Sequence, residues 1–321
     1  MKSPNKFLFV FLLISSTFVV ATSSCWLTTW VGLEMNMLGY IPFIFVKESS
    51  SESEAAVKYL IPQSLGSTIY LLAVIPLMFT NKVQSLVMIA MCLKLGVAPF
   101  HFWFPTVMVN LQLLPAFILL TWQKITPILT INSFSTLPLE YVMPIAMISA
   151  LWGGIGGMNQ TDIRLLLTYS SIGHNGWMLA SLYSTYTTMT IYMTTYMLIN
   201  ISIYFLLLKK NTKSCKQLFF YGEPSKTFML AISILSLGGL PPFAGFLMKL
   251  LVLLHTKAEM IIIFSLIIGA LMSLFYYLSL TFATLLSISE MYFIKPRMIT
   301  KKLMLFFLVQ TLPLILTLFF F

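Results

Sequence analysis

Residues 235–249 read LSLGGLPPFAGFLMK, an apolar stretch that two glycines and two prolines interrupt and that ends on a lysine. Proline removes a backbone donor and clashes with the preceding turn, so a helix cannot run unbroken through Pro241 and Pro242. Residues 91–105 read MCLKLGVAPFHFWFP and are interrupted in the same way at Pro99. Both stretches lie in long apolar runs, where carbonyl groups freed by a break must meet protein or water. They therefore predict discontinuous membrane helices.

The composition points to a membrane protein throughout. The chain has 321 residues, of which 59% are hydrophobic and only 9% are charged, whereas soluble proteins carry about 25% charged residues. Apolar runs recur roughly every 25 to 30 residues, and about 20 apolar residues suffice for a helix to cross the hydrocarbon core. Runs such as 7–20 and 303–321 do not alternate polar and apolar residues, as the strands of a membrane barrel do. We therefore expect an all-α polytopic fold.

We expect about eleven transmembrane helices, joined by short connections that make neighbouring helices antiparallel. The whole chain, 1–321, then forms a single membrane domain. The expected spans are 7–24, 26–46, 57–79, 83–105, 112–132, 139–157, 162–183, 187–208, 226–254, 259–286 and 303–320.

The loop charges give this topology an orientation. If every span crosses once, the side that holds the N-terminus carries all the loop lysines and arginines except Lys82 and Lys257. Such an asymmetry is what the positive-inside rule predicts for the cytoplasmic or matrix side, and the C-terminus then lies on the opposite side. The net charge of +10 is thus an orientation signal, and we expect membrane lipids, with no nucleic acid, as the surroundings of this chain.

The two broken helices are the fourth and the ninth spans. Because they are five spans apart, units built of spans one to five and six to ten have opposite orientations. Discontinuous helices at matching positions of two inverted repeats indicate an ion pathway. We expect one repeat at about 1–132, the second at about 138–287 and a final helix at about 303–320. Two unrelated kinks are the alternative interpretation.

Four charged residues lie inside the expected spans: Glu34, Lys94, Lys124 and Lys249. A charge at the bilayer centre costs about 2.5–3.5 kcal/mol on insertion scales, so these residues should face the protein interior. We expect Glu34 and Lys94 to pair. Burial and a movable carboxylate together make lysine a switchable proton site, which arginine is not. A structural ion pair, with lysines reaching toward the membrane surface, is the alternative.

His101 and His174 are further titratable residues inside the expected spans. Histidine changes its charge near neutral pH and can relay protons, although a lone membrane histidine can also be a packing residue. The sequence has no nucleotide-binding glycine motif, no haem-type histidine pair and no cysteine cluster. We therefore expect no cofactor, metal or redox site in this chain.

Five segments occur in a specific order: WVGLEMNMLGYIP, KLGVAPFHFWFP, LLTWQKITP, GGIGGMNQTDIRLLLTYSSIGHNGWM and LSLGGLPPFAGFLMK. Together they resemble mitochondrial NADH dehydrogenase subunit 2, the antiporter-like membrane subunit of respiratory complex I, in a form closest to the arthropod one. The resemblance covers nearly the whole chain. It implies eleven helices in two inverted five-helix repeats and a subunit of the proton-translocating NADH:ubiquinone reductase. It also implies other membrane-arm subunits as partners and the mitochondrial inner membrane as location, with the N-terminus in the matrix and the C-terminus in the intermembrane space.

The resemblance implies a role for each intramembrane charge. Glu34 and Lys94 match the paired acid and lysine of an input half-channel, Lys124 matches a central lysine, and Lys249 matches the lysine of the second broken helix. His101 matches a histidine near the first break. Flavin, iron–sulfur and quinone chemistry would belong to other subunits. Two alternatives remain: a subunit of a cation/proton antiporter complex, and a structural spacer that moves no protons.

Overall fold

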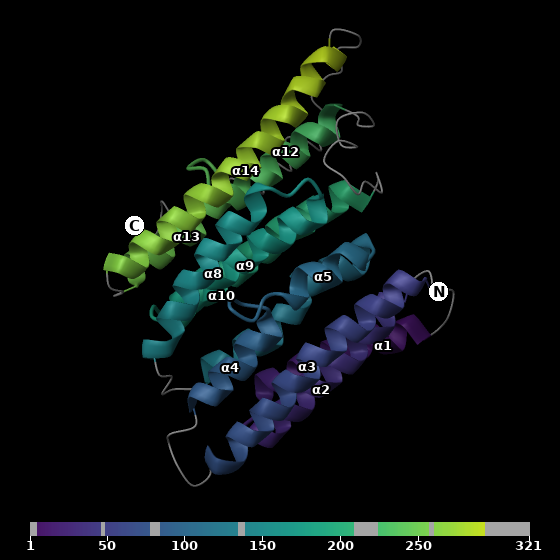
Figure 1. Cartoon of the computed structure of the whole chain (residues 1–321), viewed down its shortest axis with the longest axis vertical. Helices are drawn as coiled ribbons and strands as arrows, with labels where there is room; N and C mark the ends of the chain where they lie inside the picture. Colours follow the sequence, from purple (N-terminus) through teal and green to yellow (C-terminus); the bar gives the residue numbers. More distant parts are fainter. Residues whose placement is uncertain are drawn as a thin grey trace. The chain divides into compact units, whose positions relative to one another are not determined.

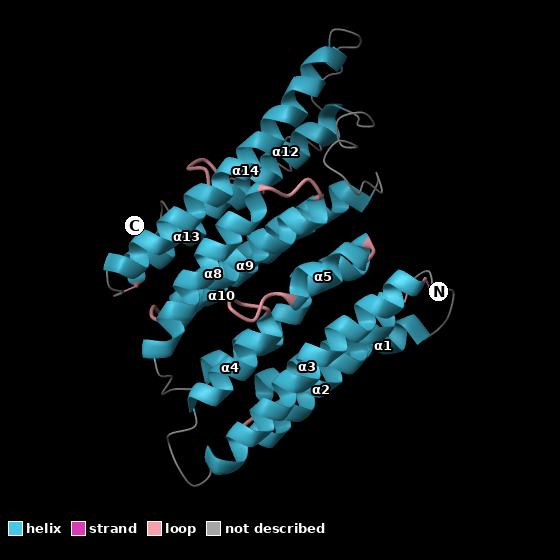
Figure 2. Cartoon of the chain, in the orientation of Figure 1, coloured by secondary structure: helices cyan, strands magenta, loops and turns pink. Residues whose placement is uncertain are grey.

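The computed structural model describes residues 5–45, 49–77, 84–133, 139–208, 224–256 and 260–292. These residues form helices joined by loops and turns, without strands (Figure 2). The helices are α1 Asn5–Thr22, α2 Trp26–Ile44, α3 Ser50–Leu77, α4 Gln84–Leu95, α5 Trp103–Asn110, α6 Leu113–Leu120, η2 Trp122–Lys124, α7 Ile125–Ser133, α8 Leu139–Met158, α9 Ile163–Ser181, α10 Tyr186–Leu208, α12 Pro224–Gly238, α13 Ala244–His255 and α14 Met260–Tyr292.

The chain folds as two compact units, divided within α8 between Ser149 and Ala150. In the first unit α1 packs along α2, and α3 packs against α2, α4 and α5 (Figure 1). The short helix α7 contacts α1, α2 and α4 and so lies at the centre of this unit. In the second unit α12 packs along α14, and α10 packs against α9, α12 and α13.

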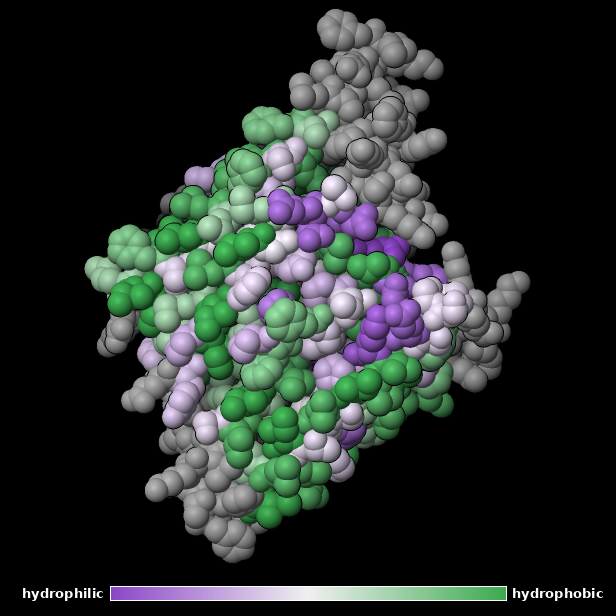
Figure 3. All heavy atoms as spheres, viewed as in Figure 1, coloured by the Kyte–Doolittle hydropathy of each residue, from purple (hydrophilic) through white to green (hydrophobic). Residues whose placement is uncertain are grey.

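Within the described residues most helices begin within about two residues of the expected spans, whereas α3 begins at Ser50 and not at residue 57. Four apolar helical stretches are long enough to cross a membrane, namely Leu113–Ser133, Tyr141–Met158, Tyr186–Leu207 and Met260–Ala283. Apolar residues also cover much of the face drawn in Figure 3, as expected for helices that meet lipid. The expected final helix, 303–320, lies outside the described residues. The total of eleven spans and the inverted-repeat boundaries stay predictions.

Both proline-containing stretches are interrupted in the structure. Helix α4 ends at Leu95 and α5 begins at Trp103, with Pro99 between them. Helix α12 ends at Gly238 and α13 begins at Ala244, so Pro241 and Pro242 lie in the gap.

A third interruption was not expected from the sequence. The span predicted as one helix over 112–132 consists of α6, the 3-10 turn η2 and α7. Pro127 has no N–H to donate to the carbonyl of Gln123, and its ring disfavours a regular turn there. The chain tightens into η2 instead, and Lys124 is the last residue of this turn.

Candidate functional site

The first break is closed by side chains that bind the carbonyl groups freed at the end of α4. Trp103 Nε1 donates to the Leu93 carbonyl at 3.1 Å, and Gln63 Nε2 donates to the Lys94 carbonyl at 3.0 Å. Gly96 has a φ of +65°, which glycine adopts readily. The break is therefore a built feature, in which α3 and the start of α5 replace the missing helical hydrogen bonds.

His101 lies within this break. Its side chain is buried, hydrogen-bonds to the backbone of Pro99 and stacks on Phe102 with a centroid distance of 4.5 Å. These contacts tie the histidine to the turn between α4 and α5. The structure thus places His101 beside the first break, as a residue that stabilises the turn and that remains a candidate relay.

Lys94 occupies the last turn of α4 and is 6% exposed. Its aliphatic stem lies against Gly66 of α3, where a Cβ would approach Lys94 Cγ to 2.8 Å. Lys94 interacts electrostatically with Glu34 of α2, but the two form no direct ion pair in the part of the chain that the structure describes. Glu34 is half-buried, and its Oε1 is a buried atom without a hydrogen-bond partner among those residues. Glu34 and Lys94 thus belong to one interior site, and neither side chain is fixed by a direct ion pair with the other.

Lys124 is 2% exposed and lies in the η2 turn. Its neighbour Gln123 belongs to an ordered series of hydrogen bonds across three helices. Tyr59 of α3 donates to Gln123 Oε1 at 3.1 Å, and Gln123 Nε2 donates to Asn36 Oδ1 at 3.1 Å. Asn36 Nδ2 then donates to Thr126 Oγ1 at 2.8 Å. This series holds the irregular turn in place and brings Lys124 into the unit that contains Glu34 and Lys94.

Lys249 lies on α13, seven residues beyond Pro242, and is 8% exposed. Its ammonium donates to the Gly238 carbonyl at the end of α12, at 2.8 Å. The C-terminal end of a helix carries partial negative charge, which favours a cation there. Lys249 therefore bridges the second break directly, whereas Gln63 and Trp103 do so at the first.

His174 of α9 faces a cluster of buried tyrosines in the second unit. His174 Nδ1 shares a 2.8 Å hydrogen bond with the hydroxyl of Tyr192, and its ring lies 5.1 Å from that of Tyr196. Tyr277 of α14 belongs to the same cluster and interacts electrostatically with Tyr192 and Tyr196. Both tyrosines that approach His174 belong to α10, which also packs against the helix of Lys249. The cluster thus gives His174 a hydroxyl partner, Tyr192, in an interior that also holds the buried polar residues Ser171 and Asn175.

Helix α10 also contacts the segment around Lys249 through Thr195, whose hydroxyl donates to the sulfur of Met248 at 3.4 Å. Met248 is 1% exposed and supports α13 one residue before the lysine.

Sequence reasoning missed the uncharged partners of the site. Asn36 and Gln123 are polar residues inside apolar spans, in EMNM and WQK, and this placement is a signal that could have identified them. Tyr59 and Tyr192 gave no such signal, since tyrosine is frequent in this chain and only the packing shows which hydroxyls meet other polar groups.

The comparisons with known proteins agree with this architecture. The family described as the transmembrane part of the NADH:quinone oxidoreductase/Mrp antiporter proteins matches residues 23–85 and 80–276. The chain is 39% identical over 303 residues to NADH-ubiquinone oxidoreductase chain 2 of Genetta servalina, covering 89% of this chain and 87% of that protein. Its identity to the same protein of Canis lupus familiaris is 38% over 303 residues, with the same coverage.

Solved structures share the fold. A chain of respiratory complex I from Thermus thermophilus superposes with a TM-score of 0.82 at 22% identity, covering 88% of this chain and 71% of that chain. A chain of the Mrp complex from Dietzia superposes with a TM-score of 0.68 at 18% identity, covering 88% of this chain and 59% of that chain. With a family match over most of its length and relatives near 40% identity, this chain belongs to the NADH-ubiquinone oxidoreductase chain 2 family.

Proposed function

We propose that this chain is a proton-translocating membrane-arm subunit of respiratory complex I, located in the mitochondrial inner membrane. Its partners are then the other membrane-arm subunits, and the flavin, iron–sulfur and quinone chemistry takes place elsewhere in the complex. The matrix side is the side of the lysine-rich loops, where the N-terminus lies. Protons move through Glu34, Lys94, Lys124 and Lys249, with His101 and His174 as relays.

One observation carries this proposal: each of the three intramembrane lysines is buried and lies at or beside an interruption of a helix. Lys94 ends α4, Lys124 ends η2, and Lys249 binds the terminal carbonyl of α12. A buried lysine is costly in a membrane, and interrupted helices supply the polar backbone groups that ion pathways use. A structural spacer that moves no protons would need neither buried lysines nor interrupted helices, and this chain combines the two at three places.

The experiment compares Lys124→Ala with Lys58→Ala in the assembled complex. Lys58 is an exposed lysine of the same unit, so it controls for the loss of a positive charge. Protons translocated per electron are measured in sealed vesicles, together with NADH oxidation and the amount of assembled complex. We expect Lys124→Ala to lower the proton yield and Lys58→Ala to leave it unchanged. An unchanged yield in both assembled variants would favour the spacer.

The antiporter alternative makes a different prediction about partners. The family description includes antiporter proteins, whereas the relatives at 38–39% identity carry the complex I name. Purification through a tag on this chain should therefore recover NADH:quinone oxidoreductase subunits. Recovery of a cation/proton antiporter assembly without them would overturn the assignment.

A further inference from the structure

The inward face of α3 carries a series of polar side chains that begins with a carboxylate. Glu52 is 1% exposed and Tyr59 is 1% exposed, and Gln63 and Gly66 continue the same face toward Lys94. Spacings of seven, four and three residues keep these positions on one side of a helix. At 1.5 Å per residue, Glu52 lies about 10 Å along the axis from Tyr59 and about 21 Å from Gly66. The buried positions between Glu52 and Tyr59 are Ala55 and Ala56, so no bulky side chain of α3 separates them.

Glu52 is held at the end of this series by the turn between α5 and α6. Gln112, the residue before α6, donates from Nε2 to Glu52 Oε1 at 2.5 Å. The next residues inward are also polar. Tyr40 donates to the Pro115 carbonyl of α6 at 2.9 Å and packs against Tyr59 with a centroid distance of 4.9 Å.

The polar series on α3 ends at the site that contains Glu34 and Lys94. Tyr59 interacts electrostatically with Glu34 and hydrogen-bonds to the neighbour of Lys124. The helices packed on α3 are α2, α4 and α5. Their charged residues are Glu34 on α2 and Lys94 on α4, while α5 carries none. Among the described residues of these four helices, the charged groups on the inward side are thus the Glu52 carboxylate at one end of α3 and the Glu34–Lys94 site farther in.

A structural role would account for part of this geometry. Ser49 precedes α3 and Glu52 is its third residue, the spacing of a capping box. A negative charge is also favourable near a helix N-terminus. Glutamine serves the capping box as glutamate does, however, and it can still accept a hydrogen bond from Gln112. The structural role therefore does not require a group that binds a proton.

We propose that Glu52 is the proton-accepting group at the matrix-side end of the inward face of α3, from which protons reach Glu34 and Lys94. This inference rests on the proposed function. The carboxylate takes a proton from hydronium, forming its O–H bond and releasing water. It then gives the proton up inward, along the Tyr59 face of α3, and returns to the carboxylate. The lysine-rich loops put the start of α3 on the matrix side, where protons enter.

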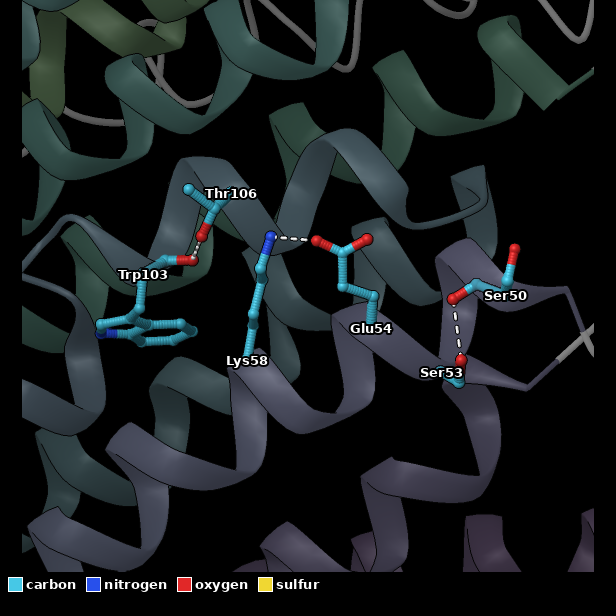
Figure 4. Close-up of polar contacts among 6 residues, drawn as sticks. All are labelled: Ser50, Ser53, Glu54, Lys58, Trp103 and Thr106. Atoms are coloured by element: carbon cyan, nitrogen blue, oxygen red, sulfur yellow. Dashed lines mark hydrogen bonds and ion pairs between the residues drawn. The ribbon is translucent and has the colours of Figure 1, made fainter.

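Glu54 is the matched control for Glu52. It lies two residues farther along α3, is exposed, and pairs with Lys58 one turn farther along the helix (Figure 4). Replacing either glutamate by glutamine removes one carboxylate from the same turn of the same helix. Only one of the two carboxylates, however, belongs to the inward face.

The experiment measures protons translocated per electron in the assembled complex for Glu52→Gln and Glu54→Gln, with Lys124→Ala as reference. We expect Glu52→Gln to lower the proton yield as far as Lys124→Ala does, and Glu54→Gln to leave it unchanged. A full yield in Glu52→Gln together with a loss in Lys124→Ala would overturn the entry role and leave the proposed function standing. Full yields in both Glu52→Gln and Lys124→Ala would overturn the proposed function and the entry role with it.

One further variant distinguishes the proton-binding role of Glu52 from a structural role. Glu52→Asp keeps a carboxylate, so it should assemble and pump even if Glu52→Gln fails to assemble. An assembled Glu52→Asp complex that does not pump would overturn the proposal.

Discussion

The adjacent glycines at the second break should respond differently to the same substitution. Gly239 has a φ of +84°, and a Cβ there would lie 3.1 Å from Lys249 Nζ and 3.2 Å from Lys249 Cδ. Gly238 ends α12, and its Cβ would meet Tyr277 at an ordinary 3.4 Å. Gly239→Ala thus imposes an unfavourable backbone conformation and displaces Lys249. The methyl group of Gly238→Ala, in contrast, is accommodated without displacing a neighbour.

The size of the effect of Gly239→Ala follows from the free-energy cost of its backbone conformation. The left-handed conformation costs a residue with a Cβ about 1–2 kcal/mol, which corresponds to a shift of about 5- to 30-fold in a local opening equilibrium. The amide of Gly239 is hydrogen-bonded to the carbonyls of Leu235 and Ser236, so its exchange reports opening of this turn. Gly238→Ala adds no such cost, because alanine is a better helix former than glycine.

Hydrogen–deuterium exchange with mass spectrometry on the assembled complex provides the measurement. Amides of the segment 239–244 should exchange about 5- to 30-fold faster in Gly239→Ala, and at the original rate in Gly238→Ala. Equal exchange in both variants, or faster exchange in Gly238→Ala alone, would refute the reasoning. Gly239→Ala should also lower the proton yield, because it moves the ammonium of Lys249.

Two further predictions concern single contacts of the site. Tyr192→Phe removes the hydroxyl that bonds His174 Nδ1 and leaves the ring, so we expect a slower proton translocation rate at an unchanged amount of assembled complex. An unchanged rate would show that this hydrogen bond serves packing alone. Gly66→Ala pushes a Cβ against Lys94, so the proton yield should fall although alanine favours the helix by about 1 kcal/mol. Gly173→Ala, where the nearest atom is 3.8 Å away, is its control and should pump normally.

The polar network also explains which residues of the site could be predicted from the sequence. Charges such as Glu34 and Lys124 stand out in an apolar chain because their insertion into lipid is costly. The hydrogen-bonded residues beside these charges, such as Asn36 and Gln123, are neutral, and which side chains they meet depends on how the helix faces pack. The expected topology placed Glu52 in a loop, because the span was expected to begin at residue 57. In the structure α3 begins at Ser50, and Glu52 is buried against the α5–α6 turn.

The sequence by itself determined the helical membrane class, the approximate spans and two of the helix breaks, because hydropathy and proline act locally. It also identified Lys94, Lys124 and Lys249 as intramembrane charges. Only the tertiary structure decided that Lys249 binds the end of α12, that Glu34 approaches Lys94 without an ion pair, and that Lys124 lies in a 3-10 turn. These features depend on which helix faces meet, and that choice involves contacts between residues far apart in the chain, which local patterns do not encode.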